Sequence, residues 1–444
     1  MIDKEINIKN LLLFSLVAAI GGLLFGFDIA IVTGAGPYFT REFELNTIQE
    51  GWAYSSLLFG AILGAAIAGR VTDKIGRKKI LIWVAVLFAI TSVGSALATN
   101  LSVLVIMRIF GGIAVGATST VAPMYISEVS PSKYRGSLVS MYQLFIVTGI
   151  LISYLINYLL SDIGDDNWRW MFATGIIPSI LFFVLLFLVP ETPRFLYKIG
   201  KKSLALEILT KVGGARNANI EIEQIEDSLK ISTDGFRSLF NPKLKKVLFT
   251  GFILAILVQL SGINTIIDYA PKIFVTAGWE LNTGLFATFG LGIINFIFTW
   301  VSIWAIDKYG RRILYIIGSA GMSVSLLFIS VAAFSGHFEG VIVLIPIFVF
   351  IAFFASCIGP VFWTYLSEIF PNYIRGTAMS VPVFTQWIFN AVVVLIFPAM
   401  LMNLSKGITF GILFLMAFAQ FIFAMIFMPE TKGKSLEEIE ELWK

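Results

Sequence analysis

Two charged residues stand deep inside long apolar stretches of this sequence. Asp28 lies in GGLLFGFDIAIVTG and Arg108 lies in VLVIMRIFGGIAVG. In a membrane-spanning helix, one such charge costs roughly 2.5–3.5 kcal/mol on insertion scales. Counted at about 1.5 Å per residue from the same membrane face, both side chains lie roughly 8–9 Å deep. The sequence therefore predicts an ion pair between them. A purely structural pair is the alternative, but buried pairs stabilise a protein poorly compared with apolar residues, which favours a functional reason.

Neutral polar side chains in the apolar stretches form a second set of candidates. Amide and indole N–H groups match solute hydroxyls, which donate and accept, without the desolvation cost of a charge. Any single one of them can instead join two helices. Their concentration in a few stretches favours solute binding. The set is Gln143, Gln259, Asn264, Asn295, Trp363, Gln386, Trp387 and Asn390.

One stretch, VQLSGINTIIDYAPKIF, carries several of these groups and is predicted to be a broken, moving helix. Ser261-Gly262 weakens the helix, and Pro271 ends its regular hydrogen-bond ladder. Asn264 and Asp268 are four positions apart, so they share one helix face.

Long helices must position these residues, and the composition places those helices in a bilayer. Of the 444 residues, 57% are hydrophobic and 14% charged, whereas soluble chains have about 45–50% apolar and about 25% charged residues. This excess excludes a soluble enzyme, a nucleic-acid binder and a disordered protein. The single cysteine, Cys357, and single histidine, His337, exclude an intramolecular disulfide and a histidine-based metal site.

Twelve apolar stretches are long enough to span a membrane, six before and six after a polar interval. No alternating barrel pattern is present, so they must be helices. They are residues 11–33, 50–70, 80–98, 102–123, 138–160, 170–190, 247–273, 284–306, 313–334, 341–363, 377–401 and 408–428.

The domain prediction follows from these stretches. It places an N-terminal six-helix bundle at 1–190, a cytoplasmic linker with short amphipathic helices at 191–246, a C-terminal bundle at 247–428 and a cytoplasmic tail at 429–444. The charged segment MIDKEINIKN precedes a retained first span and is not a removable signal peptide.

The orientation of the helices follows from Lys and Arg. The connections at 70–79, 133–135 and 308–312 are basic, whereas those at 34–49, 161–168 and 335–340 are neutral or acidic. Because basic loops stay in the cytoplasm, both termini are expected there.

The two halves of the chain repeat one another. YISEVSPSKYRG at Tyr125 recurs as YLSEIFPNYIRG at Tyr365, and VPETPR at Val189 recurs as MPETKG at Met428. DKIGRKKIL at Asp73 recurs as DKYGRRIL. Duplicated halves around a midplane site are typical of transporters.

These motifs, in this order over essentially the whole chain, resemble the sugar porter branch of the major facilitator superfamily. The resemblance adds NWRWMF and the terminal PETKGKSLEE. It implies an all-α integral membrane protein with twelve transmembrane helices in two pseudo-symmetric six-helix bundles.

The resemblance also assigns roles to the candidate residues. Proton-coupled members carry an aspartate at the position of Asp28 and the arginine matching Arg108, so these two are the expected proton-coupling residues. The balance between burial and a neighbouring guanidinium sets the pKa of such a carboxyl, which allows it to change protonation when helices separate. Family positions place the following residues in the sugar pocket: Phe25, Gln143, Gln259, Asn264, Asn295, Gly359, Trp363, Gln386 and Trp387. Asn390 is added from its residue type, and Phe25 and Trp363 are expected to stack on a sugar ring.

Two residues depart from the family pattern. Val258 replaces the first of two glutamines, and Asp268 replaces a tyrosine. Asp268 is therefore a candidate substrate-binding residue that accepts from a hydroxylated solute, attracts an amino sugar or binds a second proton. A water-exposed gate residue is the alternative.

Charged residues at the cytoplasmic helix ends form a third set, repeated in both halves. In the family such residues make salt bridges between helices that hold the outward-open state; positive-inside topology alone explains only the basic ones. The expected gate residues are Arg77, Glu128, Arg135, Glu191, Arg311, Glu368, Arg375 and Glu430.

The resulting expectation is a plasma-membrane symporter, not an enzyme, that moves a proton with a hexose, pentose or polyol by alternating access. It needs no cofactor besides the coupling proton, binds no nucleic acid and functions as a monomer. A passive sugar facilitator is the alternative, and a sugar sensor that does not transport is a further one.

Overall fold

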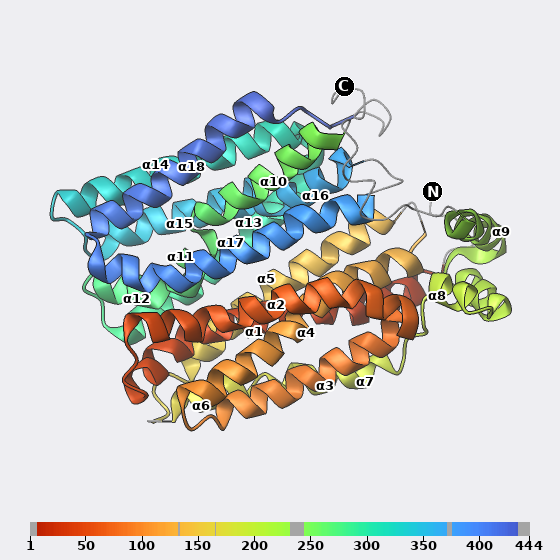
Figure 1. The fold of residues 1–444 in the computed structure, drawn as a ribbon, viewed down its shortest axis with the longest axis horizontal. Coiled ribbons are helices and arrows are strands. Elements are labelled where there is room, and N and C mark those ends of the chain that lie inside the picture. The colour runs from red at the N-terminus through yellow and green to blue at the C-terminus, as the bar shows by residue number, and fades with distance from the viewer. Residues whose placement is uncertain (1–6, 132–133, 165, 231–243, 371–374, 434–444) are drawn as a thin grey trace. The chain divides into compact units, whose positions relative to one another are not determined.

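The computed structural model describes residues 7–131, 134–164, 166–230, 244–370 and 375–433, and everything below refers to them. Their regular secondary structure is entirely α-helical (Figure 1). The helices are α1 (Ile8–Glu42), α2 (Thr47–Ile75), α3 (Arg77–Ala96), α4 (Leu101–Val129), α5 (Arg135–Leu159), α6 (Asn167–Ala173), α7 (Ile176–Leu186), α8 (Pro193–Lys198), α9 (Lys202–Lys230), α10 (Lys245–Leu260), α11 (Ile263–Asp268), α12 (Ala270–Thr276), α13 (Leu281–Tyr309), α14 (Arg311–Phe334), α15 (Gly340–Cys357), α16 (Gly359–Ile369), α17 (Arg375–Asn403) and α18 (Lys406–Phe427).

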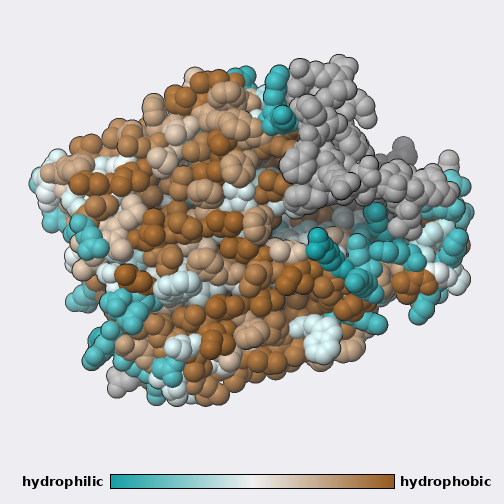
Figure 2. Space-filling model, in the orientation of Figure 1, coloured by the Kyte–Doolittle hydropathy of each residue, from teal (hydrophilic) through white to brown (hydrophobic). Residues whose placement is uncertain are grey.

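Within these residues, twelve helical segments are long and apolar enough to cross a membrane, judged by length and composition. Each overlaps one of the predicted spans, although α1 continues to Glu42, well past the predicted end, and the seventh segment ends at Asp268, before the predicted end at residue 273. Figure 2 shows hydrophobic residues over the sides of the helices and hydrophilic ones toward their ends. Large apolar side chains such as Trp83 and Val324 are exposed there, which suits contact with lipid.

The chain packs into two compact units that divide α1, α2, α5 and α6 between them. Unit 1 comprises Met1–Ile29, Gly60–Ile150 and Arg169–Ser232. Unit 2 comprises Ala30–Phe59, Leu151–Trp168 and Thr233–Lys444. This division is by packing, whereas the predicted domain bounds rest on the duplicated sequence and stay a prediction.

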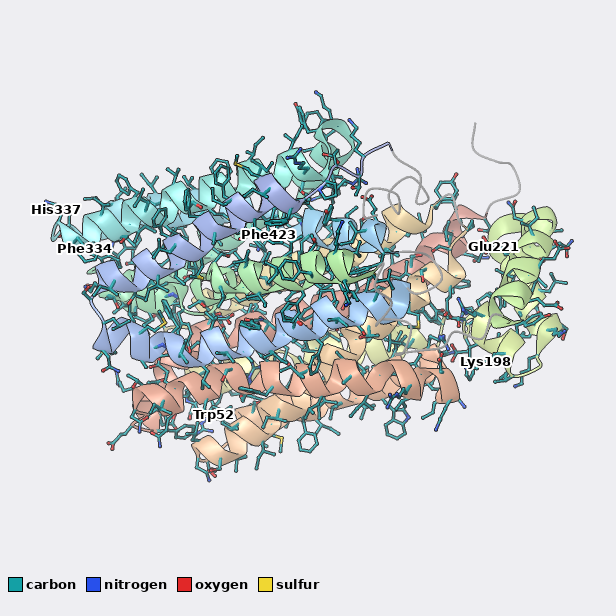
Figure 3. All side chains as sticks on the ribbon, turned by 45° about the horizontal axis from the view of Figure 1, so that its top comes forward. Trp52, Lys198, Glu221, Phe334, His337 and Phe423 are labelled. Atoms are coloured by element: carbon teal, nitrogen blue, oxygen red, sulfur yellow. The ribbon has the colours of Figure 1, made fainter. Side chains whose placement is uncertain are left out.

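In unit 1, α3 packs against α4 and α7, and α8 packs against α9. Small residues allow α2 and α4 to approach closely: a Cβ on Gly60 would collide with the Ile109 carbonyl, and one on Gly64 with the Ile113 carbonyl. The predicted linker at 191–246 contains two helices among its described residues, α8 and α9, where Figure 3 labels Lys198 and Glu221; its role as a cytoplasmic linker stays a prediction.

In unit 2, α14 lies beside α15 and α18, and α10 lies beside α17. Arg311 begins α14, while Phe334 ends it and His337 follows (Figure 3). In each unit, one set of helix ends lies near an arginine, Arg77 in unit 1 and Arg311 in unit 2. We call these helix ends the basic ends, and the ends at the other side of each unit the opposite ends.

Candidate functional site

Asp28 and Arg108 form the ion pair that the sequence predicts, within unit 1. Arg108 Nη1 donates to Asp28 Oδ1 at 2.8 Å and to the Asp28 carbonyl at 2.9 Å. The Arg108 side chain is 2% exposed and that of Asp28 16%. A Cβ on Gly111, one turn along α4, would lie 2.9 Å from Asp28 Oδ2, so the glycine leaves room for the carboxyl group. The guanidinium also lies over the Phe172 ring, 5.6 Å from its centre.

Two predicted pocket residues belong to the same unit. Phe25 lies on α1 and Gln143 on α5, and both are half-buried. Glycines bring these helices together, because a Cβ on Gly22 would lie 2.7 Å from the Tyr142 carbonyl, and one on Gly26 would collide with the Ile146 carbonyl. Phe25 is one turn before Asp28 on α1, the helix that packs closely against α5 at Gly22 and Gly26.

The predicted break in the seventh span is confirmed in unit 2. Gly262 has φ 83° and ψ 16°, a left-handed conformation that separates α10 from α11. Across the break, Asn264 Nδ2 donates to Gln259 Oε1 at 2.6 Å. Gln259 is 2% exposed. The turn at Gly262 thus brings two predicted sugar-binding amides into hydrogen-bond contact, which their spacing in a continuous helix would not do.

The remaining predicted pocket residues lie on three other helices of unit 2. Asn295 lies on α13, and the rest divide between α16 and α17: Gly359, Trp363, Gln386, Trp387 and Asn390. Asn295, Trp387 and Asn390 are buried. Gly359 begins α16 directly after α15 ends, so the tenth span also contains an interruption. Gln386 Oε1 is buried without a hydrogen-bond partner among the described residues, which leaves an acceptor for a ligand.

Asp268 ends α11 and is 4% exposed, so it is not the water-exposed residue that one alternative predicts. Its carboxyl group lies near enough to the phenols of Tyr54, Tyr154 and Tyr269 to interact with them electrostatically. Val258, the other departure from the family pattern, is buried on α10. Asp268 therefore lies one turn after Asn264 and near tyrosines that come from other helices.

A second ion pair, at the opposite ends of unit 2, was not predicted. Glu50 of α2 accepts a hydrogen bond from Lys272 of α12 at 2.5 Å. Both residues stand at the edges of predicted spans, where charges are usually assigned to solvent. The signal that could have identified them is Lys272 itself, a lone cation directly after Pro271 at the end of a long apolar stretch.

At the basic end of unit 1, Arg77 Nη2 contacts Glu128 Oε1 at 2.9 Å. Glu191 Oε1 accepts from the backbone N–H groups of Arg77 at 3.0 Å and Lys78 at 3.1 Å. These are the first donors of α3, so Glu191 caps the helix and complements its dipole.

Unit 2 repeats this arrangement. Arg311 Nη2 donates to Glu368 Oε1 at 2.6 Å, and Glu430 accepts from the backbone N–H groups of Arg311 and Arg312. The two units thus place corresponding charged groups in corresponding contacts, and capping explains why Glu191 recurs as Glu430; the gate role of the set stays a prediction. The side chains of Arg135 and Arg375 lie outside the described residues.

No cluster of three or more His, Cys, Asp or Glu side chains suited to a metal ion occurs in the described part of the chain. The ionisable groups that the structure does assemble are ion pairs and helix caps.

Comparison with known proteins identifies the family of this chain. The family model described as "Sugar (and other) transporter" matches residues 14–443. The arabinose-proton symporter of Bacillus subtilis (strain 168) is 40% identical over 449 residues, covering 100% of this chain and 97% of the relative. The D-xylose-proton symporter of Escherichia coli (strain K12) is 37% identical over 483 residues, covering 100% and 97%.

Solved structures show the same likeness. A partially occluded inward open conformation of the xylose transporter of E. coli matches with a TM-score of 0.86 at 35% identity, covering 96% of this chain and 100% of that one. The proton:xylose symporter bound to 6-bromo-6-deoxy-D-glucose matches with a TM-score of 0.82 at 36% identity, covering 98% and 99%. The major facilitator fold that the sequence motifs predict is thereby confirmed.

Proposed function

Since the chain belongs to the Sugar (and other) transporter family, we propose that it is a proton-coupled symporter of a monosaccharide or related polyol. It works by alternating access and catalyses no chemical reaction. The observation that carries this proposal is the buried ion pair between Asp28 and Arg108. Relatives at 40% and 37% identity are named proton symporters of arabinose and D-xylose, which supports the same class of solute.

Asp28 carries the coupling proton. In the ionised state its carboxylate attracts the Arg108 guanidinium, which holds α1 against α4. Protonation removes that attraction, while Arg108 retains its bond to the Asp28 carbonyl. The pair can therefore loosen without leaving the arginine unsatisfied, and each protonation state favours a different helix arrangement.

The sugar binds to the neutral amides. Gln259 and Asn264 satisfy one another across the helix break, and each keeps further donors or acceptors for a hydroxyl. Gln386 offers an unused acceptor. Gln143, Asn295, Asn390 and Trp387 complete the polar set, and Phe25 and Trp363 provide aromatic faces, with Gly359 leaving room for the ring.

The basic ends face the cytoplasm, as the positive-inside rule predicts, so both termini are cytoplasmic. The protein resides in the plasma membrane and functions as a monomer. The gate at these ends consists of the Arg77–Glu128 and Arg311–Glu368 ion pairs together with the Glu191 and Glu430 caps. Arg135 and Arg375 remain predicted members of it.

The test is uptake by the purified protein in liposomes, with labelled pentoses, hexoses and inositols and an imposed pH gradient. We expect one or more sugars to accumulate above equilibrium, and collapse of the gradient to stop the accumulation. Equilibration at the same rate with and without the gradient would instead identify a passive facilitator.

A further inference from the structure

The opposite ends of α1 and α2, at residues 30–59, pack within unit 2 together with the helices of the C-terminal sequence repeat. The Glu50–Lys272 ion pair joins these two parts of the chain. Its side chains are 7% exposed for Glu50 and 25% for Lys272, so the carboxylate is the more deeply buried partner. A buried carboxylate depends on its cation, because without it the cost of leaving water is not offset.

Aromatic contacts close the space beside this pair. Tyr54, one turn after Glu50, stacks on Tyr269 with ring centres 4.3 Å apart and planes at 20°. The Tyr269 hydroxyl donates to the Val394 carbonyl at 3.1 Å. A Cβ on Gly51 would collide with the Leu395 carbonyl, so α2 and α17 meet backbone to backbone next to Glu50.

We infer that Glu50 and Lys272 form a latch that closes the opposite end of the transporter and positions the sugar-binding helix α11. The inference rests on the proposed alternating-access function, because the two residues belong to different sequence repeats. A transporter that opens at this end must separate them once in each cycle.

The latch acts on the sugar site through the shape of the broken helix. Lys272 stands in the first turn of α12, and Tyr269 alone separates α12 from α11. Asn264, on α11, donates to Gln259. Tyr154 also holds α11, because its hydroxyl donates to the Ile267 carbonyl at 3.1 Å. When Lys272 is held by Glu50, the C-terminal end of α11 is held twice, by Tyr154 at Ile267 and through α12, and Asn264 keeps its position.

The unequal burial predicts unequal effects of the two neutralising substitutions. Lys272→Met leaves the Glu50 carboxylate buried without its cation, so it should open the latch strongly. Glu50→Gln leaves a lysine that reaches water and an amide oxygen that still accepts from it, so it should open the latch weakly. The double variant E50Q/K272M removes both charges and should lie closer to the parent than K272M alone.

The experiment measures the accessibility of a single cysteine in a Cys357→Ala background. Ala53 is buried and shares the Glu50 face of α2, so Ala53→Cys reports opening at this end. In proteoliposomes sorted for orientation, a membrane-impermeant maleimide should label the cysteine introduced at position 53 about tenfold faster in K272M than in the parent. The charge swap E50K/K272E should restore slow labelling.

The matched control is Lys406→Met. Lys406 also lies at this end of unit 2, but it donates to the Thr276 carbonyl and lies over Phe338, both within the C-terminal repeat. It should leave the labelling at position 53 unchanged. Equal labelling of the parent, K272M and E50Q, or equal acceleration by K406M, would overturn the latch.

Sugar binding provides a second readout. K272M should raise KM for the transported sugar several-fold more than it lowers kcat in sugar exchange, and the charge swap should recover KM. An unchanged KM would refute the positioning role. If the parent shows no gradient-driven uptake, the proposed coupling fails, whereas the labelling experiment still decides the latch.

Discussion

At the scale of single residues, three ion pairs of similar chemistry have different consequences because they join different segments. Asp28–Arg108 lies mid-helix within unit 1, Glu50–Lys272 joins the two sequence repeats, and Arg77–Glu128 joins two helix ends. Only a pair whose carboxylate can exchange a proton couples transport to a gradient. The buried position of Asp28 beside a fixed arginine suits that role, whereas Glu191 and Glu430 serve backbone N–H groups.

Asp28→Asn should abolish sugar accumulation driven by a proton gradient and leave sugar exchange measurable. The amide keeps the size of the side chain and its bond to Arg108 but binds no proton. Liposome uptake with and without a pH gradient measures this. Glu207→Gln is the control, since Glu207 forms an exposed pair with Lys211 on α9. Continued accumulation in the Asp28 variant would refute proton coupling through this residue.

Asp268→Asn tests whether this carboxylate contacts the solute. A lost hydrogen bond to a charged acceptor costs about 1.5–3 kcal/mol, so KM for the native sugar should rise roughly 10- to 100-fold. Asp268→Tyr should move the preference toward ordinary hexoses or pentoses in a competition assay with unlabelled sugars.

Asp162→Asn is the matched control for these variants, because its carboxylate is exposed and accepts from Asn282. If both Asp268 variants keep the parental KM and selectivity, Asp268 serves only the tyrosine cluster around Tyr54 and Tyr269. The sugar would then bind to the amides alone.

At the scale of elements, the broken seventh span is the clearest link between local sequence and function. Gly262 adopts a left-handed conformation, so α10 ends and α11 starts on a new axis. That turn brings Asn264 to Gln259. The Tyr269 break then begins α12, which carries Lys272. One apolar stretch thus carries both predicted sugar-binding amides and Lys272, one of the two residues of the proposed latch.

Gly262→Ala should weaken sugar binding and lower stability. A positive φ strains a residue with a Cβ by about 1 kcal/mol, and this Cβ would also lie 2.8 Å from Leu413. Gly278→Ala is the control, because Gly278 has φ 90° but nothing near its Cβ position. Thermal unfolding should show loss of stability in both variants, whereas only Gly262→Ala should raise KM. Equal KM values in Gly262→Ala and the parent would show that the helix break does not position the sugar-binding residues.

At the scale of the whole molecule, gating is expected to be a balance between the two ends. Under the proposed function, the ion pairs at the basic ends stabilise closure there, and the proposed Glu50–Lys272 latch stabilises closure at the opposite end. Substitutions at the two ends should therefore shift the population of conformations in opposite directions.

Arg311→Ala should slow the labelling of the Ala53→Cys reporter by the impermeant maleimide, the reverse of Lys272→Met. Loss of Arg311 leaves the Glu368 carboxylate without its guanidinium, which in the proposed function loosens the basic end. Arg312→Ala is the control, because the Arg312 side chain donates to the Met425 carbonyl. Unchanged labelling in Arg311→Ala would assign these charges to topology alone.

The sequence by itself determined the membrane-spanning helices, the duplicated halves and the Asp28–Arg108 pair. Apolar length and the cost of a buried charge are local properties that composition and spacing express directly. The break at Gly262 could also be predicted from the sequence, because glycine and proline alter the conformation of their own backbone. Contacts between segments distant in the sequence could not be predicted in this way.

Only the tertiary structure decided that Glu50 meets Lys272, 222 positions away, and that Glu191 caps α3 from 114 positions away. It also placed Asp268 among tyrosines of other helices. The physical reason is that a charge at a helix end can be solvated at little cost, so its sequence gives no sign of a partner. Packing of the helices selects that partner.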